Sequence, residues 1–318
     1  MPVNNMAEPR ARTLLKSIYE LLFHAVHEDI LLRPSRLVKM LQKHPRMRVH
    51  ISDADATIAE HRVVRWHEWG DFSALAKPHG TKGAVAGWKA VDGSYVNFKT
   101  TIPALMAFAK CHSIVEWSCE IQDLCGFSRS ESDLSQFSSL DLLAQREARD
   151  LIMDQSEAGL TRNLAHPGVR ILNSPKTTDH FVRFAWDKRT FLDATHGSHH
   201  LAAARFIAKR LGKSVTLPGL LRTYAVSQEA VNLMNADYDM FAISNDAIVK
   251  QALHEAMRSF KATYLLHRLP SPVDDAVAVL LPRNERRSVM VSSVLRRARM
   301  FDIGAHLTTV CAKQAFLM

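Results

Sequence analysis

Thr190-Phe-Leu-Asp-Ala-Thr-His-Gly-Ser-His-His-Leu-Ala-Ala-Ala-Arg205 is the stretch that decides the expected fold of this chain. It predicts a short apolar strand, then a turn rich in histidine, serine and glycine, and then an alanine-rich helix. Gly197 can adopt backbone angles that other residues avoid, and Ser198 is a good N-cap residue. Gly212 is a typical C-cap at the expected end of the helix, and a second strand is expected over 214–224.

The turn is a candidate anion-binding site. The N–H groups of a first helical turn point back toward such a turn, and the helix dipole favours negative charge there. Imidazoles beside it can donate hydrogen bonds or titrate near neutral pH. We therefore assign phosphate binding to Gly197, Ser198, His200 and Arg205, and catalysis to Asp193, His196 and His199. The alternative is an ordinary strand-to-helix turn with surface imidazoles.

The same region resembles the ParB/sulfiredoxin-like superfamily, whose loop commonly reads Asp-Gly-x-His-Arg and is followed by two small residues. The resemblance covers residues 165–225. Within this range, four residues match the pattern: Gly197, His199, Ala203 and Ala204. Two positions depart from it, because His196 stands where the aspartate is expected and His200 where the arginine is. The resemblance implies that the turn holds nucleotide phosphates, so that the ligand would be a nucleotide carrying Mg²⁺. The whole chain is also similar to uncharacterised proteins of proteobacteria and their phages.

Charge is distributed unevenly between the two halves of the 318-residue chain. Residues 1–159 carry 19 Lys and Arg against 20 Asp and Glu, whereas residues 160–318 carry 22 against 12. Such an excess favours a polyanionic partner or a phosphate-bearing ligand, although a solvated basic face would have the same composition. The candidate nucleic-acid contacts are Arg283, Arg286, Arg287, Arg296, Arg297 and Arg299. We place a domain boundary near residue 160, with the alternative that both halves share one core.

The expected fold class is α+β, with a ParB/sulfiredoxin-like strand–turn–helix core, added helices and a small N-terminal β region. Helices are expected over 7–27 and 35–43; this pair could be a helix-turn-helix, but plain packing is the preferred interpretation. Short strands are expected at 47–51 and 61–66, a hairpin turn at Asp92-Gly93, and helices with breaks from 103 to 157. The adjacent Trp66-His-Glu-Trp69 could line a pocket, but core tryptophans are expected because neighbouring strand residues face opposite sides.

No run of apolar residues is long enough for a transmembrane helix, and the start of the chain lacks the order of a signal peptide. Four cysteines without paired spacing favour reduced thiols in the cytoplasm rather than a zinc site. Two functions stay open: a phosphotransferase or nuclease-like enzyme, and a non-catalytic module that binds nucleic acid or a partner. Convergence of Asp193, His196 and His199 in one pocket would favour the enzyme.

Overall fold

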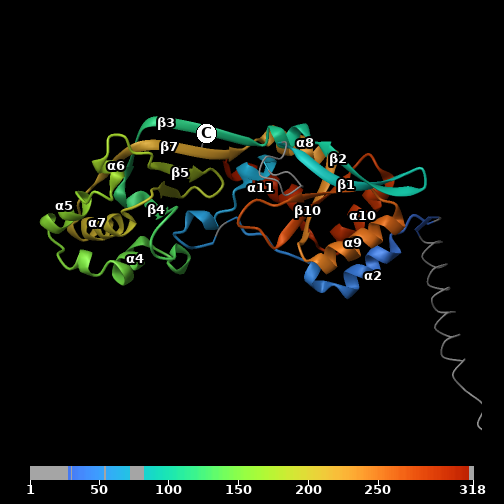
Figure 1. Cartoon of the computed structure of the whole chain (residues 1–318), viewed down its shortest axis with the longest axis horizontal. Helices are drawn as coiled ribbons and strands as arrows, with labels where there is room; N and C mark the ends of the chain where they lie inside the picture. The colour runs from blue at the N-terminus through green and yellow to red at the C-terminus, as the bar shows by residue number, and fades with distance from the viewer. Residues whose placement is uncertain (1–27, 30, 54, 72–81, 315–318) are drawn as a thin grey trace, which may run out of the picture.

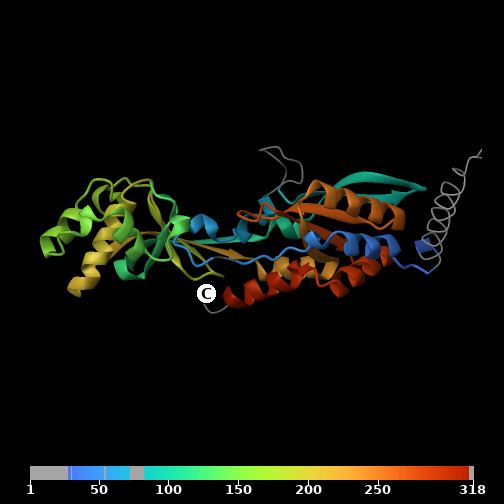
Figure 2. The ribbon, with the colours of Figure 1, turned by 90° about the horizontal axis from the view of Figure 1, so that it is seen from below.

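The structure is a computed structural model that describes residues 28–29, 31–53, 55–71 and 82–314. It has two lobes along one long axis, each built on its own sheet (Figure 1). The view turned by 90° shows the same separation of the lobes (Figure 2). The helix expected over 7–27, and with it the helix-turn-helix pair, lies outside the described residues.

The first lobe contains a six-stranded antiparallel sheet with the order β11-β8-β10-β9-β1-β2. Its strands are β1 (Ala84–Val91), β2 (Ser94–Thr101), β8 (Tyr238–Ser244), β9 (Tyr264–Arg268), β10 (Ala276–Pro282) and β11 (Phe301–Asp302). Its helices are α2 (Ser35–Lys43), α3 (Pro103–Met106), α8 (Gln228–Asp237), α9 (Ala247–Phe260), α10 (Arg286–Arg297) and α11 (Ile303–Gln314).

Alternation along the central strands gives this lobe three layers. Met240 and Ala242 of β8 pack in one apolar core with α8 and α11, whereas Phe241 and Ile243 pack in another core with α2, α9 and α10. Successive side chains of a strand point to opposite faces, so a strand that is apolar at every position can be buried on both sides.

The second lobe contains a mixed five-stranded sheet with the order β3-β7-β5-β6-β4. Its strands are β3 (Ala109–Glu120), β4 (Leu124–Phe127), β5 (His180–Phe184), β6 (Thr190–Asp193) and β7 (Thr216–Val226). Its helices are α4 (Leu140–Glu147), α5 (Glu157–Leu164), α6 (Arg170–Asn173) and α7 (Ser198–Leu211). One face of this sheet packs with α4, α5 and α7, and the opposite face shares its apolar core with the first lobe.

The segment between α2 and β1 forms short 3-10 turns instead of strands. They are η2 (Pro45–Met47), η3 (Glu60–Arg62) and η4 (Trp66–Asp71), and Trp66 and Trp69 are fully buried in the core shared by the two lobes. The expected core tryptophans are therefore confirmed.

The expected fold class is confirmed, because the chain combines antiparallel and mixed sheets with many helices. The boundary expected near residue 160 does not coincide with the separation of the two sheets. It falls inside α5, between strands β4 and β5 of one sheet. The five-stranded lobe is instead a continuous insertion of residues 109–226, and the six-stranded lobe is built from the segments on either side. Charge balance cannot reveal this arrangement, because strand pairing does not depend on net charge.

Several local expectations were wrong. Residues 47–51 and 61–66 do not form strands of either sheet, because this segment folds into the 3-10 turns that connect the lobes. The helical stretch expected from 103 includes β3, which escapes recognition because eight successive residues of it are exposed and no apolar alternation results. Correct expectations include the Asp92-Gly93 hairpin turn, where both residues have positive φ. Among the described residues, no helix combines the length and apolar composition needed to cross a bilayer.

Candidate functional site

The expected turn between β6 and α7 is present. Gly197 is the N-cap of α7 with a φ of 81°, and Gly212 is its C-cap with a φ of 61°. Ser198 is thus the first residue of the helix rather than its cap, and its side chain is buried. None of the backbone N–H groups of residues 198–200 has a hydrogen-bond acceptor among the described residues. The beginning of α7 therefore has the free donors that an anion site requires.

The three histidines of the turn have different surroundings. His196 is exposed, whereas Nε2 of His199 lies 2.8 Å from the Ser132 hydroxyl. His200 stacks on His166 with 3.6 Å between ring centroids, and its Nδ1 lies 3.0 Å from the side-chain oxygen of Asn163. Burial, together with the imidazoles of His166 and His199, lowers the pKa of His200.

Arg205 lies nearly two helical turns beyond the start of α7. Its guanidinium forms an ion pair with Asp141 and donates a hydrogen bond of 3.2 Å to the carbonyl of Gln122. Seven residues of helix rise about 10 Å, so this guanidinium belongs to the contact between α7 and α4.

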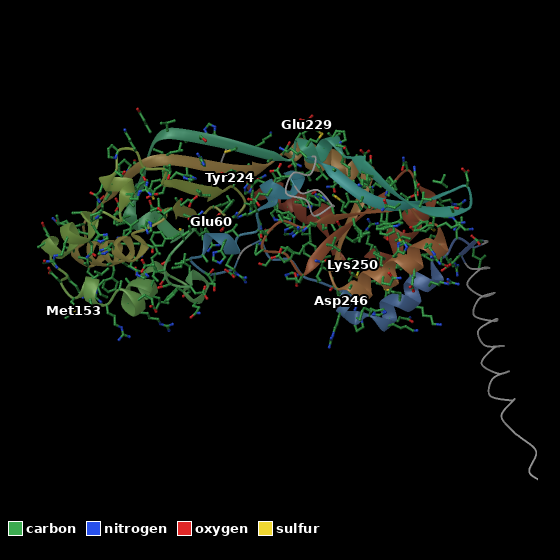
Figure 3. The ribbon with its side chains drawn as sticks, in the orientation of Figure 1. Glu60, Met153, Tyr224, Glu229, Asp246 and Lys250 are labelled. Atoms are coloured by element: carbon green, nitrogen blue, oxygen red, sulfur yellow. The ribbon has the colours of Figure 1, made fainter. Side chains whose placement is uncertain are left out.

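Asp193 lines a pocket of about 250 Å³ on the face of the sheet opposite α7. The pocket lies in the middle of the molecule, where Figure 3 labels Glu60 and Tyr224. It is lined by Glu60, Arg65, His67, Glu68, Ser128, Arg129, His180, Val182, Phe184, Asp193, Arg222 and Tyr224. His196 and His199 are not among these residues. The three candidate catalytic residues therefore do not meet in this pocket.

His180 begins β5 beside Asp193, its register partner on β6. Its Nδ1 lies 3.0 Å from the carbonyl oxygen of Thr178, and its Nε2 lies 3.3 Å from Nη1 of Arg222. A carbonyl can only accept and a guanidinium can only donate, so these contacts select the neutral tautomer with the proton on Nδ1. Nε2 thus accepts a hydrogen bond from Arg222, and it lies 3.9 Å from a carboxylate oxygen of Asp193.

The opposite wall carries two carboxylates around one guanidinium. Arg65 lies 3.1 Å from Glu60 and 3.4 Å from Glu68. Burial raises the pKa of both carboxyl groups, although Arg65 partly opposes this effect. A carboxyl group with a raised pKa can hold and release a proton closer to neutral pH than an ordinary one.

His67 stacks on Tyr224 with 4.2 Å between ring centroids. Burial and the neighbouring charge of Arg65 lower the pKa of His67 to about 4, so its imidazole is neutral at physiological pH. Its buried Nδ1 has no hydrogen-bond partner among the described residues. Titratable groups with shifted pKa values that share one pocket are typical of functional sites.

Sequence reasoning missed most of this pocket. For the wall formed by His67 and Glu68 alone, a usable signal was the spacing of Trp66 and Trp69, because residues three apart share a face of a 3-10 helix. The two tryptophans face the core, which leaves His67 and Glu68 free to line the pocket. Two further aspartates near Asp193 in the sequence do not line the pocket. Asp179 is buried and neither of its carboxylate oxygens is hydrogen-bonded to a described residue, whereas Asp187 pairs with Arg189 at 2.8 Å.

Residues 114–318 match the family of unknown function DUF6685. The chain belongs to this family. No curated protein and no solved structure matches it. The segment matched to DUF6685 contributes Ser128, Arg129, His180, Asp193 and Arg222 to the pocket, and the wall formed by residues 60–68 comes from outside it. Within the described parts of this DUF6685 protein, no three His, Cys, Asp or Glu side chains are grouped as a metal site.

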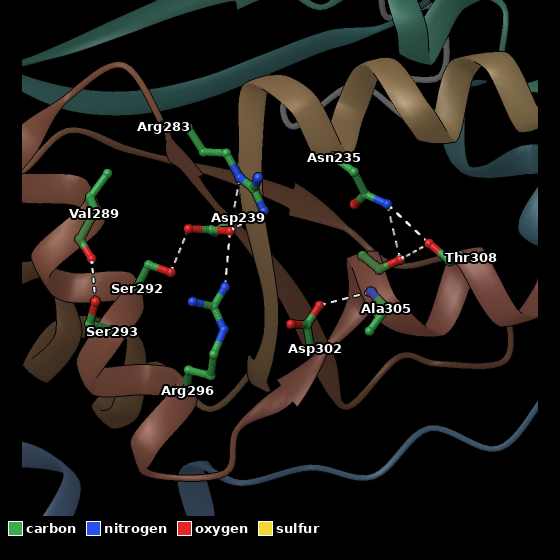
Figure 4. A network of polar contacts seen from close by, with 11 residues as sticks. Asn235, Asp239, Arg283, Val289, Ser292, Ser293, Arg296, Asp302, Ala305 and Thr308 are labelled. Carbon is green, nitrogen blue, oxygen red and sulfur yellow. Dashed lines mark hydrogen bonds and ion pairs between the residues drawn. The ribbon is translucent and has the colours of Figure 1, made fainter.

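The six arginines predicted to contact nucleic acid have three different kinds of surroundings. Arg283 and Arg296 converge on the buried Asp239, at 2.7 and 3.1 Å, and Ser292 donates to the other carboxylate oxygen (Figure 4). Arg287 donates to the carbonyl of Phe260 and pairs with Asp29. The remaining three are exposed and form no ion pair with any described residue: Arg286, Arg297 and Arg299.

Proposed function

We propose that this protein binds a phosphate-bearing ligand, a nucleotide or the end of a nucleic acid, in the pocket around His180 and acts on it as a phosphotransferase or nuclease-like enzyme. The observation that carries the proposal is the grouping of His180, Asp193 and Arg222, in which Nε2 of His180 lies 3.3 Å from the guanidinium and 3.9 Å from the carboxylate. A base, a carboxylate and a cation at one place are the elements that phosphoryl chemistry uses.

Each wall has a distinct role in this proposal. Arg222 and the exposed Arg129 bind the phosphate oxygens, because guanidinium groups match the geometry of phosphate. When Arg222 turns its N–H groups to the phosphate oxygens, Nε2 of His180 is released from Arg222 and accepts the proton of the attacking water or hydroxyl group as its oxygen bonds to phosphorus. As the phosphorus–oxygen bond to the leaving group breaks, Glu60 or Glu68 supplies a proton to the departing oxygen.

The size of the pocket limits what enters it. A volume of about 250 Å³ lies below the range of roughly 300–1,000 Å³ that is usual for drug-sized ligands. One phosphoryl group and its nearest atoms fit, and the rest of the ligand extends outside. Mg²⁺ is commonly bound by one or two carboxylates together with substrate phosphates, so Asp193 would hold the ion that accompanies a nucleotide.

The turn at Gly197, Ser198 and His199 is part of the same proposal as a second phosphate-binding element, with the exposed His196 as its candidate acid–base group. This part of the proposal is supported by the positive φ of Gly197 and by the N–H groups at the start of α7, which have no hydrogen-bond acceptor among the described residues. On the basis of the same two features, we also propose that this strand–turn–helix is related to the ParB/sulfiredoxin-like superfamily. A cytoplasmic location is proposed too, supported by four cysteines that are all free thiols.

A thermal-shift series tests the proposal. Nucleotides and inorganic phosphate, with and without Mg²⁺ or Mn²⁺, should raise the melting temperature, because a ligand present at 100 times its Kd stabilises the native state by about 2.7 kcal/mol. Arg222→Met and His180→Gln should weaken or abolish the shift while the unliganded proteins stay folded. If no phosphate compound stabilises the wild-type protein, the proposal fails.

The second candidate function is a non-catalytic nucleic-acid-binding module. It is favoured by Arg286, Arg297 and Arg299, which are exposed without an ion pair among the described residues. Their charges are free to contact a phosphate backbone.

A further inference from the structure

Three alternating serines join the turn before α7 to the pocket. Ser128, Ser130 and Ser132 are partly buried, and the two residues between them are exposed. The three hydroxyls all contact residues between Asp193 and His199, so the three side chains point the same way. We call Ser128, Ser130 and Ser132 the serine row.

The members of the serine row contact Asp193, Ser198 and His199, and the Ser130 hydroxyl also lies 3.5 Å from Nε2 of His199. Ser128 donates a hydrogen bond of 2.6 Å to Asp193, and the hydroxyls of Ser130 and Ser198 are 2.8 Å apart. The Ser132 hydroxyl lies 2.8 Å from Nε2 of His199. The backbone adds a further contact, since the N–H of Ser128 donates to the carbonyl of Leu192 at 3.1 Å.

The first contact of the row has a direct consequence for the pocket. Ser128 holds one carboxylate oxygen of Asp193, and the other oxygen is left facing His180. Arg129 follows Ser128 in the chain and lines the same pocket. The orientation of Asp193 and the place of Arg129 therefore both depend on where the serine row lies.

We propose that the serine row and His199 form a latch that positions Asp193 and Arg129, and that His199 is a positioning residue for the pocket. The inference rests on the proposed function of that pocket. It gives the histidine-rich turn a task that does not require its imidazoles to touch the ligand. Residues held by a second layer of hydrogen bonds keep the geometry that binding and catalysis require.

His199→Ala and His199→Gln test the latch together. A glutamine amide can still bond Ser132, whereas alanine cannot. Loss of one hydrogen bond should weaken the binding of inorganic phosphate roughly fivefold in the alanine variant, and glutamine should restore most of the affinity. Ser132→Ala should match His199→Ala, and Ser135→Ala is the matched control because its hydroxyl bonds only Asp133 on the exposed surface. Calorimetry measures the affinity.

Hydrogen exchange of residues 128–132 supplies a second measurement that needs no ligand. We expect faster exchange of these residues in His199→Ala and wild-type exchange in His199→Gln. This result is expected even if the wild-type protein binds no phosphate, in which case the latch would be supported while the proposed function fails. Wild-type exchange in His199→Ala would overturn the latch. Phosphate binding that glutamine fails to restore would also overturn it, because the imidazole would then act on the ligand directly.

Discussion

Gly197 packs directly against the backbone of Gly168. A Cβ atom built on Gly197 would lie 2.3 Å from the carbonyl oxygen of Gly168, far inside any allowed contact. The position thus requires glycine twice, once for its φ of 81° and once for its lack of a side chain. This contact fixes the turn against the loop that precedes α6.

Gly197→Ala should therefore destabilise the protein severely. Backbone strain at a positive φ alone costs about 1–3 kcal/mol, and the clash with Gly168 adds to it. Gly212→Ala is the matched control, since that glycine also has a positive φ but a Cβ there would have no described atom within 4 Å. Urea denaturation of both variants separates strain from clash, and equal losses would contradict the clash.

The contact between Asp53 and α11 should contribute to stability in a pH-dependent way. Burial alone would raise the pKa of Asp53, but hydrogen bonds from His306, Lys313 and Trp66 outweigh burial and hold that pKa well below its usual 3.8. A depressed pKa means that the stabilisation is complete above pH 3.8 and is lost as the pH falls further. Asp53→Asn should cost about 2–3 kcal/mol at neutral pH, the scale of hydrogen bonds to a charged group.

Denaturation of Asp53→Asn across the acid range checks this prediction, with Asp71→Asn as control. Asp71 pairs with Lys82 on the exposed surface, where an ion pair contributes only about 0–1 kcal/mol. A loss at Asp53 no larger than that at Asp71 would show that the contact with α11 is not stabilising.

His67 should make the protein less stable as the pH falls from 6.5 toward 4. The folded-state pKa is about 4, below the usual 6.5, so in this window the unfolded chain binds a proton that the folded protein does not. His67→Phe keeps an aromatic ring against Tyr224 and should flatten this part of the pH profile. The buried His267 also has a pKa of about 4, so its contribution to the pH dependence of stability should remain in the His67→Phe variant. Exposed His61→Gln is the control, and a similar flattening there would contradict the assignment.

Replacing Arg286, Arg297 and Arg299 by glutamine tests the nucleic-acid-binding alternative. For every phosphate that an arginine no longer neutralises, the slope of log K against log salt should fall by about 0.9. Arg283→Gln with Arg296→Gln should change the slope less, because both guanidinium groups already face Asp239. Fluorescence anisotropy with a short DNA duplex at several salt concentrations measures the slope, and an unchanged triple variant would rule out these three arginines as phosphate ligands.

The sequence allowed the strand–turn–helix around Gly197 to be predicted because every signal there is local. An apolar strand, a glycine at a positive φ, a helical repeat and a second glycine at Gly212 all agree within some twenty residues. The buried tryptophans and the Asp92-Gly93 turn were predictable for the same reason.

The pocket was not predictable because its walls come from distant segments. Glu60 and Arg222 are brought together by the packing of the 3-10 turns on β7, and no local pattern records that contact. The charge excess of the C-terminal half could not locate a site, because net charge does not tell which arginines are paired, as Arg283 and Arg296 are with Asp239.

The insertion of residues 109–226 also sets an order of events on the ribosome. Gly87 of β1 pairs with Leu265 of β9, so the inner edge of the β1–β2 hairpin finds its partner only after the whole inserted lobe has been synthesised. At about 5–20 residues per second, this delay lasts roughly 9 to 36 seconds. All five strands of the inserted lobe are synthesised before β9, so we expect that lobe to fold first, while the edge of the nascent hairpin stays unpaired and open to aggregation until β9 arrives.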